Sequence, residues 1–487
     1  MGYVDGEGMM GYDEGEEPDR TDVDERAAPP RVLFTTVYRN PGEGYDYIGA
    51  NSRSRWFRFR WPRDQSFGLR FLQQNVPELQ IVEFPTFDQF KRRLAEGWDV
   101  VGISFYISET EEALAMADFA RASGAVGEVW AGNYGALTPA VEEKFDRVFV
   151  GYAEDEVAAY FGRKVDEIVH PPLIEHLAAP FGLKLNIYGA LFTIRGCAVG
   201  CKFCQATSFC SRPRPLPLES IERVLSYYRD QGIKVVVIED ESFGADRRHA
   251  DRVAELLDEY GMVWGCMARA DYLIDKIDEW AEMRRRPSRG IGDKNPVRGF
   301  AGAAIGIENF HQEVLDGVAK REGAGEILET VEKLKSHGLG TVGYYMIGFP
   351  TDTAASIRED VERLASLKLD LTQICVLTPL PRTKLWEEVA ERYGISDPDY
   401  HHFDGKHLVW NHPNISPAEM EVLLDWSMRR VNPRTAPLRS SARIWRKAYR
   451  EAGVAGIGVL LSCLVRANRF EYGGPPRMLD RDRREKD

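Results

Sequence analysis

The chain has 487 residues, of which 44% are hydrophobic, 11% aromatic and 29% charged. This length and composition leave room for two or three globular domains and exclude collagen-like, coiled-coil and wholly disordered proteins. Seven cysteines in a chain of this length are too few for a disulfide framework, so we expect a reduced, cytoplasmic protein. The net charge of −13 argues against nucleic-acid binding as the main activity.

Residues 1–29 are expected to be a disordered acidic leader, because residues 1–28 contain ten acids and only two bases. This leader lacks the basic and apolar segments of a signal peptide. No later run approaches the roughly 18 apolar residues of a transmembrane helix. The closest, Val454–Val465, is followed by Arg466 and fits a buried helix, which we favour, or a hairpin resting on a membrane surface.

Residues 30–163 alternate between short apolar strands and amphipathic helices, which predicts a Rossmann-like, doubly wound parallel sheet. Strands are expected at Arg31–Val37, Leu79–Phe84, Val100–Phe105, Glu128–Ala131 and Arg147–Val150. Helices are expected at Phe67–Gln74, Phe87–Glu96, Glu109–Ala122, Pro139–Lys144 and Glu154–Phe161. Ligands of such sheets bind beyond the carboxyl ends of the strands, and no GxGxxG fingerprint favours a dinucleotide.

Residues 164–184 are expected to be a linker, and residues 185–385 then repeat a strand–helix pattern. The six expected strands are Leu191–Arg195, Lys234–Glu239, Val263–Ala268, Gly302–Glu308, Thr341–Ile347 and Leu371–Leu377. The helices between them are Leu218–Gln231, Arg248–Tyr260, Leu273–Arg285, Ala324–His337 and Ala354–Leu367. Six units predict a partial (β/α)6 TIM-like barrel with its chemistry at the carboxyl ends of the strands. Residues 386–487 are expected to form a C-terminal helical region.

Three cysteines follow the first barrel strand on a glycine-containing loop, at Cys197, Cys201 and Cys204. Thiolates at this spacing suit an iron–sulfur cluster or zinc. A structural zinc site needs four protein ligands, and the spacing of Cys210, the one nearby candidate, suits no common zinc module. Three thiolates on a [4Fe–4S] cluster leave one iron open, which is the interpretation we favour over zinc or over three unrelated buried cysteines.

The spacing Cys-x3-Cys-x2-Cys, with the aromatic Phe203 before the third cysteine, resembles the signature of the radical S-adenosylmethionine (radical SAM) superfamily. Residues 30–430 are similar to the subgroup with an N-terminal cobalamin-binding domain. The resemblance implies that SAM chelates the open iron and is cleaved to a 5′-deoxyadenosyl radical. It further implies a cobalamin-dependent C-methyltransferase acting on an unactivated carbon, with an electron donor such as flavodoxin or ferredoxin.

The resemblance also suggests contacts to SAM at the mouth of the barrel. In Glu239-Asp240-Glu241 one carboxylate would orient the ammonium or ribose, the alternative being a solvated loop. Arg269 would pair with the SAM carboxylate or else form an interdomain salt bridge. Glu308 follows a buried strand and needs a partner, which a ribose hydroxyl or ammonium would supply.

Two later turns carry similar expectations. Gly348-Phe349-Pro350 resembles a family turn that lets the backbone approach adenine, the alternative being an ordinary turn. Many relatives have glycine where this chain has Arg382, so the local backbone and the charge there depart from the family pattern.

If cobalamin is bound, the groups at the strand ends of the first sheet should line it: Ser104, Tyr106, Asn133, Gly135 and Gly151. All nine histidines lie at or beyond residue 170, so residues 30–163 offer no imidazole to cobalt. The alternatives are a cobalamin-binding cyclase or rearrangement enzyme, and a non-catalytic metal-binding scaffold. The substrate is a small molecule, and the apolar run near the C-terminus permits a lipid-like one and peripheral contact with a membrane.

Overall fold

The computed structural model describes residues 29–39, 65–178, 184–283 and 298–433, together with single helical positions between 442 and 461. The expected acidic leader, up to residue 28, lies outside the described residues, as does most of Val454–Val465. In the part of the chain that is described, no helix is both long and apolar enough to span a bilayer.

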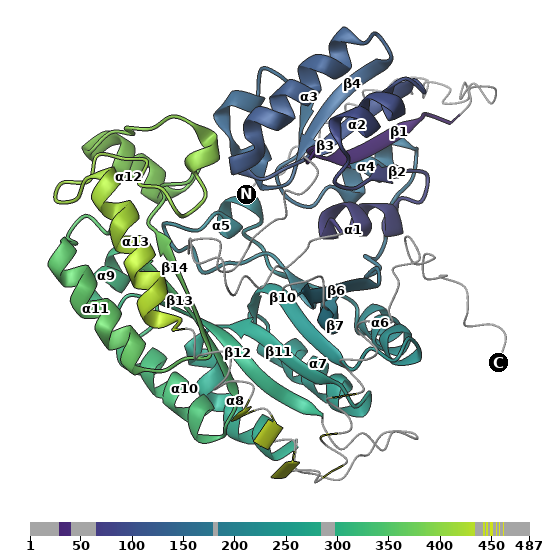
Figure 1. Ribbon diagram of the computed structural model, residues 1–487. Helices are drawn as coiled ribbons and strands as arrows, with labels where there is room; N and C mark the ends of the chain where they lie inside the picture. Colours follow the sequence, from purple (N-terminus) through teal and green to yellow (C-terminus); the bar gives the residue numbers. More distant parts are fainter. Residues whose placement is uncertain are drawn as a thin grey trace, which may run out of the picture.

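The N-terminal sheet has five parallel strands, in the order β2-β1-β3-β4-β5, within the described residues (Figure 1). The strands are β1 (Val32–Thr36), β2 (Gln80–Val82), β3 (Trp98–Ser104), β4 (Val126–Gly132) and β5 (Arg147–Val148). The helices are α1 (Phe67–Asn75), α2 (Phe87–Leu94), α3 (Thr110–Ala122) and α4 (Glu154–Tyr160), with short 3-10 turns η1 (Ile107–Glu109), η2 (Tyr134–Leu137) and η3 (Pro139–Val141). The predicted doubly wound sheet is therefore confirmed.

The strand order reverses between β1 and β3, which is where open parallel sheets form a ligand crevice. β1 is buried along its whole length, as expected for a strand with both faces covered. Gly102 in β3 shapes the crevice, because a Cβ there would lie 2.5 Å from the ring of Phe34. The expected helix Pro139–Lys144 is only the 3-10 turn η3.

The second sheet runs β14-β13-β12-β11-β10-β7-β6 in the described residues, with six adjacent parallel strands (Figure 1). Its strands are β6 (Leu173–Ala178), β7 (Lys184–Leu191), β10 (Val235–Phe243), β11 (Val263–Ala268), β12 (Gly299–Glu308), β13 (Gly340–Ile347) and β14 (Leu371–Val376). Its helices are α6 (Leu218–Asp230), α7 (Arg247–Glu259), α8 (Ala270–Met283), α9 (Gln312–Gly317), α10 (Ala324–Ser336) and α11 (Ala354–Ser366), followed by α12 (Lys384–Arg392) and α13 (Pro417–Val431). This curved sheet, with α7, α8, α10 and α11 along its outer face, confirms the predicted partial barrel.

Two details differ from the expectations. The stretch expected as a linker contains β6, which pairs antiparallel with β7 and extends the sheet. The first barrel strand is β7, which ends at Leu191 rather than spanning Leu191–Arg195. Residues after Leu191 leave the sheet, and Ile194–Arg195 (β8) instead pairs with Arg214–Pro215 (β9).

The region after the barrel contacts the N-terminal domain. A 3-10 turn, η5 (Tyr400–His402), packs against η1 and α3. The imidazole of His401 lies between Glu112, at 2.9 Å from Nε2, and Asp399, at 3.0 Å from Nδ1. The hydrogen bond to Glu112, together with that to Asp399, raises the pKa of His401 above its usual value. A protonated His401 therefore ties the C-terminal region to α3.

We predict that His401→Gln removes a pH-dependent part of the stability. A folded-state pKa above the unfolded one gives stability that is fully present below about pH 6.5 and is lost as the pH rises through the folded pKa. Thermal unfolding from pH 5.5 to 8.5 should show the largest difference between the two proteins at the acidic end. A difference that is constant with pH would contradict this role for His401.

Candidate functional site

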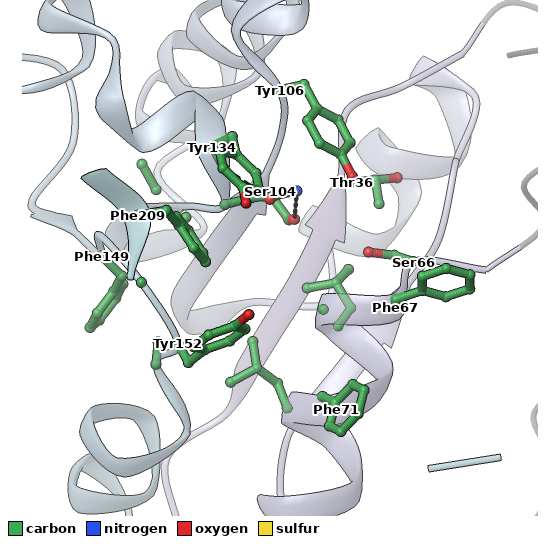
Figure 2. A pocket seen from close by; sticks show the side chains of 18 of the residues that line it. Thr36, Ser66, Phe67, Phe71, Ser104, Tyr106, Tyr134, Phe149, Tyr152 and Phe209 are labelled. Atoms are coloured by element: carbon green, nitrogen blue, oxygen red, sulfur yellow. Dashed lines mark hydrogen bonds between the residues drawn. The ribbon is translucent and has the colours of Figure 1, made fainter. Parts of the chain in front are cut away.

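A cavity of about 700 Å³ lies between the carboxyl edge of the N-terminal sheet and the cysteine loop. Aromatic side chains from both domains surround it (Figure 2). Its wall includes Phe34, Phe67, Phe71, Phe84, Tyr106, Trp130, Tyr134, Phe149, Tyr152, Phe192, Phe203 and Phe209. A mostly apolar cavity with a few polar groups is the usual form of a cofactor or substrate site.

Four of the five strand-end residues expected to contact a cofactor line this cavity: Ser104, Tyr106, Asn133 and Gly151. Asn133 has a φ of 70°, and its amide caps Tyr134 N at 2.9 Å and donates to Ser104 Oγ at 3.4 Å. Gly135 is not part of the wall. A Cβ there would meet the ring of Phe105 at 2.2 Å, so glycine serves packing at this position.

A stack of aromatic rings joins the two domains across the cavity. The rings of Tyr106 and Tyr134 are 6.3 Å apart at 10°, and those of Tyr134 and Phe209 are 4.5 Å apart at 21°. Phe209 ends α5 (Ala206–Phe209), the short helix that follows the third cysteine. The cysteine loop is thus stacked against the N-terminal sheet.

The three cysteines lie on one loop and are free thiols. Backbone bonds from Cys197 N to Cys210 O (3.0 Å), Lys202 N to Val318 O (2.9 Å) and Cys204 N to Cys201 O (3.1 Å) hold it. The pKa of the Cys204 thiol is raised to about 12, mainly by burial and to a lesser extent by the neighbouring thiols of Cys201 and Cys197.

These residues fit a cluster of iron and sulfide in the chemistry of their donors. They are soft thiol ligands, and glycines with positive φ, Gly196 and Gly200, turn the loop around them. Cys210 Sγ lies 3.5 Å from the carbonyl of Arg212, and its backbone and thiol pack against Gly196. Among the described residues no group of three or more His, Cys, Asp or Glu side chains is arranged to hold a single metal ion.

A buried carboxylate anchors the start of this loop. Asp240 is fully buried, and its Oδ1 accepts from Thr193 N at 2.6 Å and from Ile194 N at 3.1 Å, while its Oδ2 accepts from the Thr193 hydroxyl. Burial raises the pKa of Asp240 to about 7, against the opposing effect of these hydrogen bonds. Asp240, expected near SAM, therefore faces the loop backbone and not the cavity.

The neighbouring acids face the other way, because side chains alternate along a strand. Glu239 and Glu241 both line the cavity. Glu241 accepts from the Tyr152 hydroxyl at 2.8 Å and from Gly196 N at 3.2 Å, which connects the N-terminal sheet to the residue before Cys197. Side chains in β10 alternate between its two faces, and this alternation was the sequence signal that Glu239 and Glu241 point away from Asp240.

A second interdomain link was missed by the sequence analysis. Arg195 and Glu154 form an ion pair of 2.8 Å, with side chains only 6% and 4% exposed. The Arg195 guanidinium also lies 4.1 Å from the ring centre of Phe71 and 4.4 Å from that of Tyr152. No local pattern reveals this pair, since its members are 41 residues apart.

Arg269 and Glu308 belong to a buried ionic network within the barrel. Lys320 Nζ lies 3.1 Å from Glu308 and 3.2 Å from Glu322. Burial alone would lower the pKa of Lys320, but these two carboxylates raise it. Arg269 pairs with Asp271 (3.2 Å) and Glu322 (3.5 Å), so its ion pairs stay within the barrel. Lys320 was not singled out from the sequence.

The turn Gly348–Pro350 is held by Asp352, whose carboxylate accepts from Gly348 N at 2.8 Å and from Phe349 N at 2.9 Å. Burial raises the pKa of Asp352 to about 6, and the two amides oppose that shift. Gly348 has a φ of 87°, and the carbonyl of Pro350 faces Asn414. These contacts fix the turn in place.

Arg382 adopts the left-handed conformation, with a φ of 60°, which explains why glycine suits this position. Its guanidinium pairs with Glu142 of the N-terminal domain, and both side chains are about half exposed. The backbone carbonyls of Pro381 and Arg382 accept hydrogen bonds from Gln205 and Ser208, at 2.8 and 2.6 Å. Pro381 and Arg382 of the barrel therefore contact the segment that follows Cys204, and Arg382 also contacts the N-terminal domain.

Comparison with known proteins agrees with this arrangement. Residues 191–364 match the family model described as the Radical SAM superfamily. These residues carry the cysteine loop and most of the partial barrel, so the chain contains a radical SAM domain.

Individual relatives are distant. The chain is 25% identical over 204 residues to an uncharacterized methyltransferase of Pyrococcus horikoshii, covering 41% of each protein. It is 21% identical to bacteriochlorophyllide d C-12(1)-methyltransferase of Chlorobaculum tepidum, over 64% of this chain and 70% of that one. The chain spans about two fifths of the length of the first of these relatives.

The structure of the radical S-adenosylmethionine methyltransferase TsrM from Kitasatospora setae, with cobalamin and a [4Fe-4S] cluster bound, has the same fold. It superposes with a TM-score of 0.57 at 15% identity, covering 83% of this chain and 90% of that chain. The shared fold therefore includes the N-terminal sheet as well as the barrel.

We predict that Thr193→Val weakens the anchor of the cysteine loop. The substitution removes the hydroxyl donor to Asp240 and leaves a buried acceptor short of one bond, a loss of about 1–3 kcal/mol. Iron bound per chain after anaerobic reconstitution should fall, and Thr193→Ser, which keeps the hydroxyl, should restore it. Equal iron content in the valine and serine variants would contradict this role.

We predict that Arg382→Gly changes stability little. Relief of the left-handed conformation offers about 1–2 kcal/mol, and loss of the exposed pair with Glu142 costs about 0.2–1 kcal/mol. Glu142→Gln, which loses the pair without that relief, should be the less stable of the two in denaturant unfolding. The reverse order would show that the ion pair outweighs the backbone strain.

Proposed function

We propose that this protein is a radical SAM enzyme that binds a [4Fe–4S] cluster, SAM and cobalamin and acts as a C-methyltransferase on an unactivated carbon. The observation that supports it best is the cavity of about 700 Å³, whose wall contains Cys204 and Phe203 on one side and Ser104, Asn133 and Gly151 on the other. A cluster ligand thus shares one cavity with the ligand edge of the N-terminal sheet.

The cysteines Cys197, Cys201 and Cys204 would hold the cluster, and the cavity carboxylates would orient SAM. The ends of β3 and β4 would hold the corrinoid. When bound, the reduced cluster and SAM supply a 5′-deoxyadenosyl radical, and cobalamin supplies the methyl group. The aromatic wall of the cavity excludes water and so protects a radical from side reactions.

The names of similar proteins support methyl transfer as the proposed reaction. A methyltransferase acting on bacteriochlorophyllide d, and TsrM with cobalamin and a cluster bound, both resemble this chain over most of its length. The apolar and aromatic character of the cavity favours a substrate with a large unsaturated or lipid-like surface. A small-molecule substrate and an external electron donor complete the proposed reaction.

We predict that anaerobically reconstituted protein shows the broad visible absorption of a [4Fe–4S] cluster, and that Cys201→Ala abolishes it. Non-covalent mass spectrometry of the purified protein should detect a corrinoid. With a chemical reductant and SAM, 5′-deoxyadenosine should form. The matched control is Cys266→Ala, since Cys266 is buried in β11 and should leave iron content unchanged.

The same experiments separate the alternatives. A colourless protein that retains zinc would refute the radical chemistry and favour the scaffold. Labelled methyl from SAM that never appears in product, despite 5′-deoxyadenosine formation, would favour the cyclase or rearrangement enzyme. A cluster without a corrinoid would refute the cobalamin part of the proposal.

A further inference from the structure

Exposed apolar side chains gather near the C-terminus. Four of the seven large hydrophobic side chains that are exposed in the described residues lie between positions 445 and 461. They are Trp445 (36% exposed), Tyr449 (58%), Val454 (80%) and Leu461 (49%). Single exposed apolar side chains are common, but a group of them marks a surface that binds a partner. The buried helix favoured from the sequence at Val454–Val465 is therefore wrong for Val454 and Leu461.

Basic side chains lie beside these exposed apolar groups. The described positions between 442 and 450 are helical, and Arg443, Arg446 and Arg450 follow the spacing i, i+3, i+7 that places side chains on one face of a helix. Trp445 and Tyr449 are four positions apart and share a different face. Arg446 and Arg450 are exposed, like the two aromatic side chains. The segment therefore has aromatic rings on one face and positive charge on another.

The charge of this part of the chain is opposite in sign to that of the whole protein. Residues 440–466 contain five basic residues and one acid, a net charge of +4, whereas the whole chain has a net charge of −13. The apolar run Val454–Val465 contains no charged residue and is shorter than the roughly 18 apolar residues that cross a bilayer. A basic amphipathic helix is typical of segments that lie on a membrane surface. The apolar run can enter the membrane interface without spanning it.

One ion pair fixes the point where this segment leaves the folded barrel. Arg443 Nη2 lies 2.5 Å from Asp370 Oδ2, and the two side chains are 33% and 19% exposed. Asp370 directly precedes β14 and accepts from Thr341 N of β13 at 2.9 Å, so the pair lies at the amino ends of these strands. The cysteine loop lies at the opposite, carboxyl end of the barrel sheet (Figure 1). Changes in the segment therefore leave the proposed cluster site untouched.

We propose that the helical segment marked by the described positions between 442 and 461, the C-terminal anchor, binds the surface of an anionic phospholipid bilayer. Lipid phosphates attract Arg446 and Arg450, the aromatic rings lie at the level of the head groups, and Val454 and Leu461 enter the apolar layer below them. A nucleic acid would use the arginines alone and leave the apolar side chains in water. A second copy of the chain would bring its own positive segment against this one. The anchor requires neither cluster nor SAM, so it does not depend on the proposed function.

The test is flotation of the full chain with sealed vesicles, made either of phosphatidylcholine alone or of phosphatidylcholine mixed with phosphatidylglycerol. The unsubstituted protein should float with the anionic vesicles, and less of it should float as salt screens the charges. Arg446→Glu with Arg450→Glu should lower the partition coefficient on anionic vesicles about tenfold or more, because basic side chains near an anionic surface each add to the binding. Val454→Asn with Leu461→Asn should also lower it, at every salt concentration, because less apolar surface enters the bilayer.

Each double variant has a matched control elsewhere on the surface. Arg92→Glu with Arg392→Glu makes the same change in net charge on α2 and α12. Val422→Asn removes an exposed apolar side chain, 62% exposed, from α13. Both controls should float as the unsubstituted protein does, and all variants should keep its thermal unfolding midpoint because the substituted side chains are exposed.

Equal flotation of the Arg446 and Arg450 double variant and its control would overturn the anchor, as would an unsubstituted protein that floats with neither kind of vesicle. Sedimentation of the lipid-free protein as a dimer that Val454→Asn with Leu461→Asn dissociates would assign the surface to a second copy of the chain instead. Tighter binding to a short double-stranded DNA than to anionic vesicles, lost in Arg446→Glu with Arg450→Glu, would assign it to nucleic acid.

Discussion

The buried carboxylate of Asp240 is the interaction on which the candidate site depends. Taking a carboxylate out of water is costly unless hydrogen bonds replace the lost solvent, and here all three donors come from Thr193 and Ile194. These bonds draw the chain out of the barrel sheet immediately after β7. The cysteine loop therefore leaves the barrel at a defined point and in a defined direction.

Because the loop leaves the barrel in this direction, it can form two contacts with the N-terminal domain. The next residue along the chain, Arg195, reaches Glu154 in a nearly dry environment, and Glu241 joins Gly196 to Tyr152. Breaking a buried ion pair by removing one partner typically costs about 3–5 kcal/mol, so the position of the loop relative to the N-terminal sheet is strongly specified. The cavity is bounded by these same side chains, which means that the contacts that join the domains also define its shape.

Different parts of the site were predictable to different degrees. The doubly wound sheet, the six-stranded partial barrel and the cysteine loop follow from local patterns, because period, apolar runs and spacing are properties of neighbouring residues. The strand ends carrying Ser104, Asn133 and Gly151 line the cavity, since parallel strands bring their carboxyl ends to one edge. Asp240 and Gly135 do not line the cavity. Side-chain alternation along β10 turns Asp240 away from it, and that alternation could be read from the sequence. The packing of Gly135 against Phe105 could not, because it joins residues 30 positions apart.

The sequence by itself determined the two α/β units, the position of the three thiols and the edge of each sheet that carries polar groups. Only the tertiary structure decided which carboxylate serves the loop and which serves the cavity, and that Arg195, Arg382 and His401 hold the two domains together. The physical reason is that burial and ion pairing depend on residues 41, 240 and 289 positions apart. Of these pairs, only Arg195 with Glu154 is shielded from water, with side chains 6% and 4% exposed, and a low-dielectric environment strengthens that pair.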